Sequence, residues 1–282
     1  MAASFGSVDH EWLLRMVAHR IADPRILRLI RMWLEAGVLE GDEWHETDEG
    51  TPQGAGISPL LANIFLHYVL DLWVHQWRRH HAHGRVSIVR YADDFVMGFE
   101  KSADAQQMLA NLKERLAKFG LSLHEDKTRL IEFGRLPALA RQQRGERRPE
   151  TFAFLGFTHY CGWTRDGSFI VKHRTQGKRL TRKLKALRQD AWRHMHAPVA
   201  DQHCWLSSVL RGHYGYYGVP HNWRAMSGFH QEVRRIWITC LRRRSQKGRR
   251  MTWDQFQALT ERFPLPQPRI THPWVAGTAR CG

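Results

Sequence analysis

The sequence predicts an α+β protein whose first part mixes strands with helices and whose last part is helical. Residues 86–99 hold two short β-prone runs that flank an acidic pair, which is typical of a β-hairpin. From residue 178 onward, apolar residues recur at the spacing of an α-helix. We therefore expect two domains, a mixed one at 1–172 and a helical one at 173–282.

The mixed part also carries helical patterns. Residues 10–38 have Leu, Ile and Val at helical spacing with a break near Pro24, which predicts two helices joined by a turn. A Ser-Pro start at Ser58 leads into an apolar pattern that predicts a helix to about residue 79, with Pro inside its first turn. The acidic, Gly-rich stretch 40–56 between them predicts a loop or a short hairpin.

The remaining elements follow from the same signals. A helix is expected over 103–119, with Gly120 at its stop position. Residues 135–150 have no clear period and predict a linker or insertion. The further strands are expected at 121–123, 129–133, 152–159 and 169–172. The further helices are expected at 178–195, 202–217 and 225–244, before a last segment with Thr252 as N-cap.

Charge is segregated along the chain. Residues 1–135 hold 16 Lys and Arg and 19 Asp and Glu, whereas residues 136–282 hold 27 and 8, a net charge of +19. Trp, Tyr and His are interleaved with the basic residues, which favours a surface that binds polyphosphate. A solvated basic surface that serves solubility is the alternative, and the separation of sign makes it the less favoured one.

Several classes of protein are excluded by composition. No apolar run approaches the roughly 20 residues that cross a bilayer, and the start lacks a signal-peptide pattern. The four cysteines are scattered without a CxxC pair, which argues against a zinc site and against a disulfide framework. We expect a soluble intracellular protein without a membrane partner.

The acidic pair Asp93 and Asp94 is the first chemical signal. Adjacent carboxylates on a tight turn repel each other unless a cation is present. Hard oxygen ligands on such a turn suit Mg²⁺, and two such ions support an in-line displacement at phosphorus. Ordinary turn chemistry is the alternative, because Asp is common in turns for local reasons.

Five motifs resemble those of the reverse transcriptases of bacterial group II introns. Residues 91–94 read Tyr-Ala-Asp-Asp, and some forty residues upstream, residues 51–63 read Thr-Pro-Gln-Gly-Ala-Gly-Ile-Ser-Pro-Leu-Leu-Ala-Asn. Three further matches follow in family order: Gly-Leu-Ser-Leu-His-Glu-Asp-Lys-Thr at 120–128, Phe-Leu-Gly-Phe at 154–157 and Leu-Arg-Gly-His-Tyr-Gly-Tyr-Tyr at 210–217. The resemblance covers nearly the whole chain, and on it the chain is identified as a member of this family.

The resemblance implies a fold and a function. Residues 1–172 would form part of a polymerase palm, an antiparallel sheet with helices, and residues 173–282 an all-helical thumb or maturase domain. The activity implied is RNA-directed DNA polymerisation by two-metal transfer with Mg²⁺, together with binding of intron RNA for splicing and mobility. The partners implied are intron RNA, an RNA template with a DNA primer, and dNTPs, in the bacterial cytoplasm at the nucleoid or in a ribonucleoprotein. A homodimer, or a second chain that supplies the fingers, stays open.

The resemblance also implies roles for particular residues. Asp93 and Asp94 are the expected catalytic and metal-binding carboxylates. The residues expected near the nucleotide and template are Phe5, Gln53, Gly54, Tyr91 and Lys127, and those of the primer grip are Leu155 and Gly156. The residues expected to bind RNA are Lys178, Arg179, Lys183, Arg182, Arg211, Arg242, Arg243 and Arg244. For Lys127 a surface lysine, and for residues 154–157 simple core packing, are the alternatives.

The first palm motif is where the sequence departs from the family. Aligning residues 8–10 on that motif places its first catalytic Asp immediately before Met1, and the fingers that should precede it are missing. Asp9 follows the lost position and is expected to cap a helix. The expectation is therefore an incomplete two-metal site and weak or absent polymerisation by this chain. The alternative is a palm and thumb remnant that binds RNA without chemistry.

Overall fold

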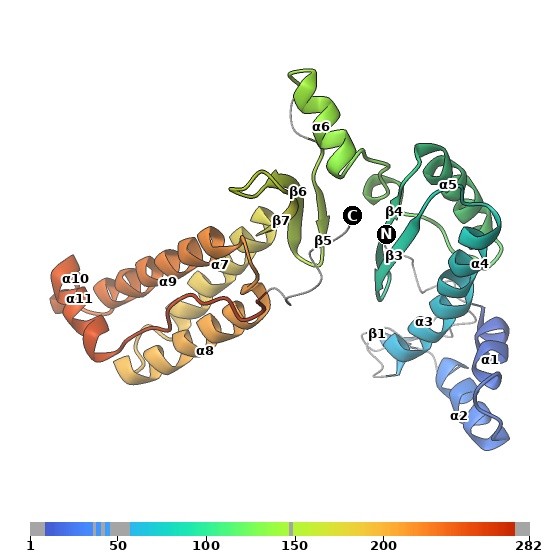
Figure 1. Ribbon diagram of the computed structural model, residues 1–282. Coiled ribbons are helices and arrows are strands. Elements are labelled where there is room, and N and C mark those ends of the chain that lie inside the picture. Colours follow the sequence, from blue (N-terminus) through green and yellow to red (C-terminus); the bar gives the residue numbers. More distant parts are fainter. Residues whose placement is uncertain (1–8, 36–37, 41–42, 46–56, 147–148, 274–282) are drawn as a thin grey trace. The chain divides into compact units, whose positions relative to one another are not determined.

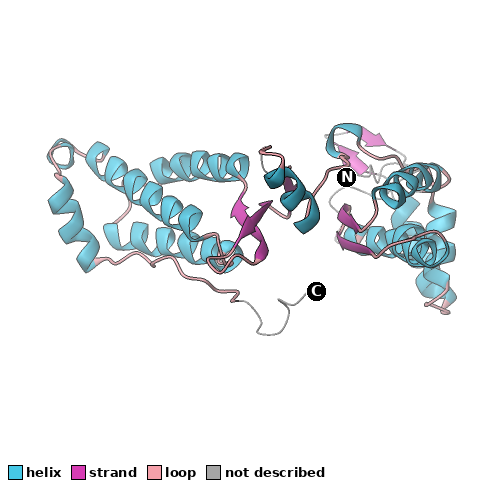
Figure 2. Cartoon of the chain, turned by 45° about the horizontal axis from the view of Figure 1, so that its top comes forward, coloured by secondary structure: helices cyan, strands magenta, loops and turns pink. Residues whose placement is uncertain are grey.

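The computed structural model describes residues 9–35, 38–40, 43–45, 57–146 and 149–273, apart from the side chains of 38–40, 43–45 and 247. The chain forms two compact units, residues 1–131 and 132–282, and each is described by itself (Figure 1). Helices, cyan in Figure 2, make up most of both units, and the strands, magenta, form small antiparallel sheets. In the described ranges, no helix is both long enough and apolar enough to cross a membrane.

Unit 1 begins with the two helices that the sequence predicts. They are α1 (His10–Ala18) and α2 (Pro24–Glu35), with Asp9 as N-cap of α1, as expected. Next comes a long helical stretch of three parts, α3 (Ser58–Leu66), a π-helical segment (His67–Asp71) and α4 (Leu72–His80), which confirms the helix expected from residue 58. The helix α5 (Ser102–Ala117) follows the hairpin, and Gly120 takes a φ of 69° just after it.

The strands that the structure describes in unit 1 form two hairpins. The short β1 (Val38–Glu40) pairs with β2 (Glu43–His45), and β3 (Val86–Tyr91) pairs with β4 (Asp94–Phe99) from Val86 opposite Phe99 to Tyr91 opposite Asp94. Alternate residues of this second hairpin pack on the core of unit 1, which contains Phe65, Leu66, Val69 and Leu70. The packing fixes the hairpin on the helical stretch and with it the turn at Asp93.

The strands expected at 121–123 and 129–133 are wrong. Residues 121–133 have no regular structure apart from a 3₁₀ turn at Glu125–Lys127. Leu121 is buried and Leu123 packs against the core without joining a ladder. A strand needs a neighbour to satisfy its backbone groups, and neither segment pairs with the β3–β4 hairpin, so β-propensity alone does not produce a strand.

Unit 2 begins with a helix where the sequence predicted a linker. The helix α6 (Arg135–Gln143) is rich in Ala, Arg and Gln, which favour helix, and its Pro137 lies in the first turn where Pro is tolerated. Ala138 is its only buried residue, so the segment shows little hydrophobic period. The sheet that follows contains β5 (Phe152–Phe154), β6 (Phe157–Trp163) and β7 (Phe169–Thr175), two of them in the stretch where one strand was expected.

The helices that follow the sheet in unit 2 match the predicted pattern. They are α7 (Gly177–Arg193), α8 (Val199–Tyr217), α9 (Trp223–Arg243), the short α10 (Gln246–Arg249) and α11 (Trp253–Arg262). Their core includes Leu210, Tyr214, Phe229, Trp237 and Phe256. Thr252 caps α11 in a reciprocal capping box with Gln255, as its sequence position indicated. The compact units divide after Ile131, upstream of the predicted palm and thumb boundary, and the functional division at 172 stays a prediction.

Candidate active site and nucleic-acid interface

The acidic pair lies at the tip of the β3–β4 hairpin. Tyr91 pairs with Asp94, so Ala92 and Asp93 form a two-residue turn. Ala92 has a φ of 53° and Asp93 is not among the positive-φ residues, which is the pattern of a type II′ turn. That turn favours Gly at its first central position, so Ala92 holds a backbone conformation that costs energy for a residue with a side chain.

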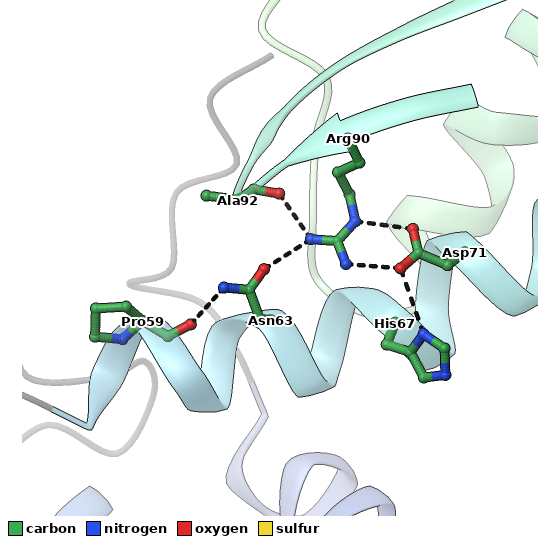
Figure 3. Close-up of polar contacts among 6 residues, drawn as sticks. All are labelled: Pro59, Asn63, His67, Asp71, Arg90 and Ala92. Carbon is green, nitrogen blue, oxygen red and sulfur yellow. Dashed lines mark hydrogen bonds and ion pairs between the residues drawn. The ribbon is translucent and has the colours of Figure 1, made fainter. Parts of the chain in front are cut away.

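Arg90 links this turn to the helical stretch that carries Asn63 and Asp71 (Figure 3). Its Nε and Nη2 donate to the two carboxylate oxygens of Asp71 at 2.8 and 2.6 Å. Its Nη1 donates to the carbonyl oxygen of Ala92 at 2.9 Å and to Oδ1 of Asn63 at 2.8 Å. One guanidinium therefore joins the turn to two positions on the helical stretch.

The helical stretch places the two partners of Arg90. Asn63 lies on α3, and its Nδ2 donates to the carbonyl oxygen of Pro59 at 2.9 Å, which orients the amide so that Oδ1 faces Arg90. Asp71 closes the π-helical segment, and its Oδ2 also lies 3.4 Å from Nδ1 of His67. Single π-helical turns inside α-helices shift the register of the residues after them and are frequent at functional sites.

The donor set of the turn fits a magnesium ion in part. Asp93 and Asp94 are half-buried carboxylates that follow one another at a fixed turn. Within the described ranges, no group of three or more His, Cys, Asp or Glu side chains forms a metal cluster. Mg²⁺ is commonly bound by one or two carboxylates and completes its shell with waters and substrate phosphates, so the pair suits one edge of such a site.

Two of the other residues expected at the nucleotide, Tyr91 and Lys127, are described by the structure and are exposed. Tyr91 precedes the turn and is 67% exposed. Lys127 is exposed on the 3₁₀ turn, where the surface-lysine alternative also places it. Phe5, Gln53 and Gly54 lie outside the described residues.

A second hairpin turn lies at the expected primer grip. Phe154 pairs with Phe157, and the two residues between them both have positive φ, 48° at Leu155 and 79° at Gly156, the pattern of a type I′ turn. The hydroxyl of Tyr216 donates to the carbonyl oxygen of Leu155 at 2.8 Å. As at Ala92, a residue other than Gly holds a strained conformation while a side chain from outside the turn binds its carbonyl.

A shallow groove of about 500 Å³ lies beside this second turn. Its lining is mostly apolar and aromatic, and comprises Phe154, Leu155, Phe157, His159, Gly215, Tyr216 and His272. The rings of Phe157 and Tyr216 stack with centroids 5.9 Å apart. Tyr216 is half exposed, so of the aromatic residues in 213–217 it is the one open to a base, whereas Tyr214 is buried and bonded to Nδ1 of His230 at 3.0 Å.

The residues expected to bind RNA divide into exposed and inward-facing side chains. Those that are exposed are Lys178, Arg179, Arg182, Arg211, Arg242 and Arg243, and Arg244 is half-buried. Arg242 donates from Nε to the carbonyl oxygen of Met251 at 2.9 Å. Arg243 lies over the ring of Trp192, with its guanidinium carbon 5.1 Å from the ring centroid. An exposed aromatic ring and a cation therefore lie together at the C-terminal end of α7.

Lys183 faces the bundle rather than the surface. Its Nζ lies 3.3 Å from Nδ1 of His213 and 5.5 Å from the centre of the Phe229 ring. Burial lowers the pKa of Lys183, and burial followed by the nearby Lys183 charge lowers the pKa of His213 to about 3. His213 is therefore neutral at neutral pH, and the pair serves the packing of the bundle.

Arg90 and Asp71 were missed by sequence reasoning. The signal was present, because Val86, Ile88 and Arg90 alternate on the half-buried face of β3, and an arginine at such a position requires an acidic partner. The sequence does not indicate which carboxylate pairs with Arg90, because Asp71 lies 19 residues earlier on a helix.

An acidic hairpin turn in an α+β unit and a basic, mostly helical unit with exposed aromatics are features typical of proteins that bind nucleic acid. The chain belongs to the family described as "Reverse transcriptase (RNA-dependent DNA polymerase)", whose model matches residues 1–159. More than half of the sequence lies in that match, which confirms the reverse transcriptase resemblance of the motifs.

Individual relatives match shorter stretches. The chain is 46% identical over 72 residues to "Group II intron-encoded protein LtrA" of Lactococcus lactis subsp. cremoris, covering 26% of this chain and 12% of that protein. It is 43% identical over 65 residues to "Uncharacterized 91 kDa protein in cob intron" of Schizosaccharomyces pombe, covering 23% and 8%. It is 31% identical over 123 residues to "Protein YkfC" of Escherichia coli (strain K12), covering 34% and 32%. The matched stretches span a third or less of each relative.

Proposed function

We propose that the chain is the palm and thumb part of a group II intron-encoded RNA-directed DNA polymerase and maturase. Family membership over residues 1–159 and the similarity to an intron-encoded protein support this function. The observation that carries the proposal is the clamped hairpin turn that presents Asp93 and Asp94 as neighbouring carboxylates. In this proposal residues 1–172 act as palm and 173–282 as thumb.

The residues of the turn would hold the metal, and their neighbours would orient the substrates. Asp93 and Asp94 offer carboxylate oxygens to Mg²⁺, which when bound neutralises charge on the reacting phosphates. Tyr91 presents an exposed ring beside the turn, and Lys127 an ammonium on the same unit, for a nucleotide triphosphate. Gln53 and Gly54 keep their expected role at the nucleotide.

The second unit would bind the primer and the intron RNA. The Leu155–Gly156 turn and the neighbouring Tyr216 offer a fixed edge for the primer strand. The exposed cations of α7 and of the end of α9 offer contacts to phosphates, and such contacts make RNA binding strongly dependent on salt. In this proposal the protein works with RNA in the cytoplasm, on an RNA template with a DNA primer and dNTPs.

Primer extension tests the proposal. The purified chain is given an RNA template, a DNA primer, Mg²⁺ and labelled dNTPs, and Asp93→Ala is compared with it. We expect Asp93→Ala to lose extension, because removing one carboxylate of the metal site removes much of the charge stabilisation on which phosphoryl transfer depends. Extension that Asp93→Ala leaves unchanged would contradict the assigned site.

The alternative function is binding of intron RNA without polymerisation. The basic surface of unit 2 favours it, since that surface needs no metal. Affinity for structured RNA against duplex DNA, measured across a salt series, separates the two. RNA-selective binding with no extension at all would favour the remnant, whereas extension that depends on Asp93 would favour the enzyme.

A further inference from the structure

Ala92 is strained, and the strain requires a restraint. A φ of 53° is a conformation that a residue with a Cβ seldom adopts, and the surrounding structure must hold it. The direct contact that the structure gives to its carbonyl is the hydrogen bond from Nη1 of Arg90. The carbonyl of Ala92 and the amide nitrogen of Asp93 belong to one rigid peptide plane, so a bond that orients the first also orients the second.

We propose that Arg90 is a positioning residue for the carboxylates of the turn, anchored by Asp71 and Asn63. The proposal rests on the function proposed above, in which Asp93 and Asp94 hold the metal. In this proposal Arg90 acts through the backbone of Ala92. Its effect is to keep the turn in the one conformation that presents both carboxylates.

The geometry requires an arginine. Four N–H groups are engaged at once: two on the Asp71 carboxylate, and the others on Asn63 and Ala92. The planar guanidinium fixes these directions relative to one another, whereas the ammonium of lysine is a point charge on a flexible stem. Lysine can keep the charge near Asp71 but cannot hold Asp71 in a fork and reach the Ala92 carbonyl at the same time.

The charge balance also suits a positioning role. The side chain of Arg90 is 14% exposed and its ion pair with Asp71 is largely shielded from water. Because Asp71 already neutralises Arg90, the cation is not left to pair with the carboxylates of the turn and compete with a metal there. The exposed pair of Arg85 with Glu100, 3.7 Å apart near the other end of the hairpin, has no such contacts to the turn.

The anchors make the restraint stiff. Asn63 is held by its own hydrogen bond to Pro59 within α3, and Asp71 ends the π-helical segment whose Val69 and Leu70 are fully buried. Movement of the turn together with Arg90 would therefore have to break the hydrogen bonds from Arg90 to Asp71 and Asn63 on the core helical stretch of the unit. The nucleotide-contact motif of residues 51–63 ends at Asn63, so the same amide links that motif to the carboxylate turn.

The test compares Arg90→Lys and Asn63→Ala with the control Arg85→Lys in the full chain. Hydrogen–deuterium exchange of the amides at 92–94 reports whether the turn is held. Terbium luminescence sensitised by aromatic side chains reports metal affinity, and the double variant Asp93→Ala with Asp94→Ala supplies the background. Thermal unfolding checks that each variant is folded. If Arg90→Lys is unstable, Asn63→Ala still tests the proposal, because that variant leaves the ion pair of Arg90 with Asp71 intact.

We expect faster exchange at 92–94 and Tb³⁺ binding weaker by about tenfold in Arg90→Lys, with a smaller change of the same sign in Asn63→Ala. The control should match the wild-type chain in both readouts. Unchanged exchange in Arg90→Lys would overturn the proposal, as would faster exchange with unaltered Tb³⁺ affinity. If the double Asp variant binds Tb³⁺ as the wild type does, the metal site of the proposed function fails, while exchange still decides whether Arg90 holds the turn.

Discussion

Tyr216 on α8 donates its hydroxyl hydrogen to the carbonyl oxygen of Leu155, 61 residues earlier, at 2.8 Å. Leu155 has a φ of 48° at a turn position where Asn or Gly is favoured. The same device holds Ala92, whose carbonyl accepts from Arg90. Both turns that the sequence marks as functional are thus strained turns fixed by one side chain from outside the turn, and this shared design gives the first prediction.

The variant Tyr216→Phe should loosen the β5–β6 turn. One hydrogen bond is removed and the ring stack on Phe157 is kept, so the free energy of unfolding should fall by about 1 kcal/mol. In primer extension the KM for primer and template should rise more than kcat falls. Urea unfolding and steady-state kinetics measure the two effects.

Tyr160→Phe is the matched control for that prediction. Tyr160 lies in the same sheet, and its described contact is the guanidinium of Arg174 over its ring, which phenylalanine keeps. The control should resemble the wild-type chain in both measurements. Equal effects of the two variants would refute a specific role for the Tyr216 hydroxyl.

Gly156→Ala should destabilise unit 2 more than Gly167→Ala does. Both glycines have a φ of 79°, so the backbone strain of an added Cβ is the same. At Gly156 the Cβ would lie 3.0 Å from the hydroxyl of Tyr217 and 3.3 Å from Nη1 of Arg179, whereas at Gly167 it meets no atom within 4 Å. We expect about 1 kcal/mol for Gly167→Ala and about 1 kcal/mol more for Gly156→Ala, by urea unfolding.

The exposed cations of α7 should determine the salt dependence of RNA binding. Lys178→Ala with Arg182→Ala removes two exposed charges, and the slope of log affinity against log salt should become shallower by about 1 to 2 units. Filter binding to a structured RNA between low and moderate salt measures the slope.

A pair of charges removed from unit 1 is the control for this slope. Arg20→Ala with Arg25→Ala takes the same net charge from exposed positions on the acidic unit. The slope should stay within error of the wild-type value. A slope that falls equally for both pairs would indicate an effect of net charge alone, and the α7 surface would then not be the binding face.

His213 should make unit 2 less stable in mild acid. Its pKa in the folded chain is about 3 and its ordinary value 6.5, so the unfolded chain binds the proton first. The stability that this neutral histidine contributes is present above pH 6.5 and is lost as pH falls toward 3, by about 2 kcal/mol at pH 5. Urea unfolding at pH 7 and pH 5 measures the loss.

His213→Gln tests the assignment of that loss. Glutamine keeps an acceptor for Lys183 and cannot be protonated in this range, so the variant should lose less stability between pH 7 and pH 5 than the wild-type chain. The exposed residue His196 gives the control His196→Gln, which should keep the wild-type pH dependence. A variant at 213 with an undiminished loss would assign the effect to other buried histidines.

Local signals predicted most of the elements correctly. The hairpin at 86–99, the break at Pro24 and the caps at Asp9 and Thr252 all depend on interactions within a few residues, and such interactions can be read along the chain. The helix α6 escaped prediction because it buries a single residue, Ala138, and so shows no period.

The sequence by itself determined the family motifs, the acidic turn and the basic helical region, because each depends on the identity of residues that are close together along the chain. Only the tertiary structure decided that Arg90 binds Asp71 and Asn63, that Tyr216 binds Leu155, and that Lys183 turns inward. It also left 121–123 without a strand partner. Each of these outcomes depends on which groups the folded chain brings within hydrogen-bonding distance across 19 to 61 residues, and no local pattern encodes that choice.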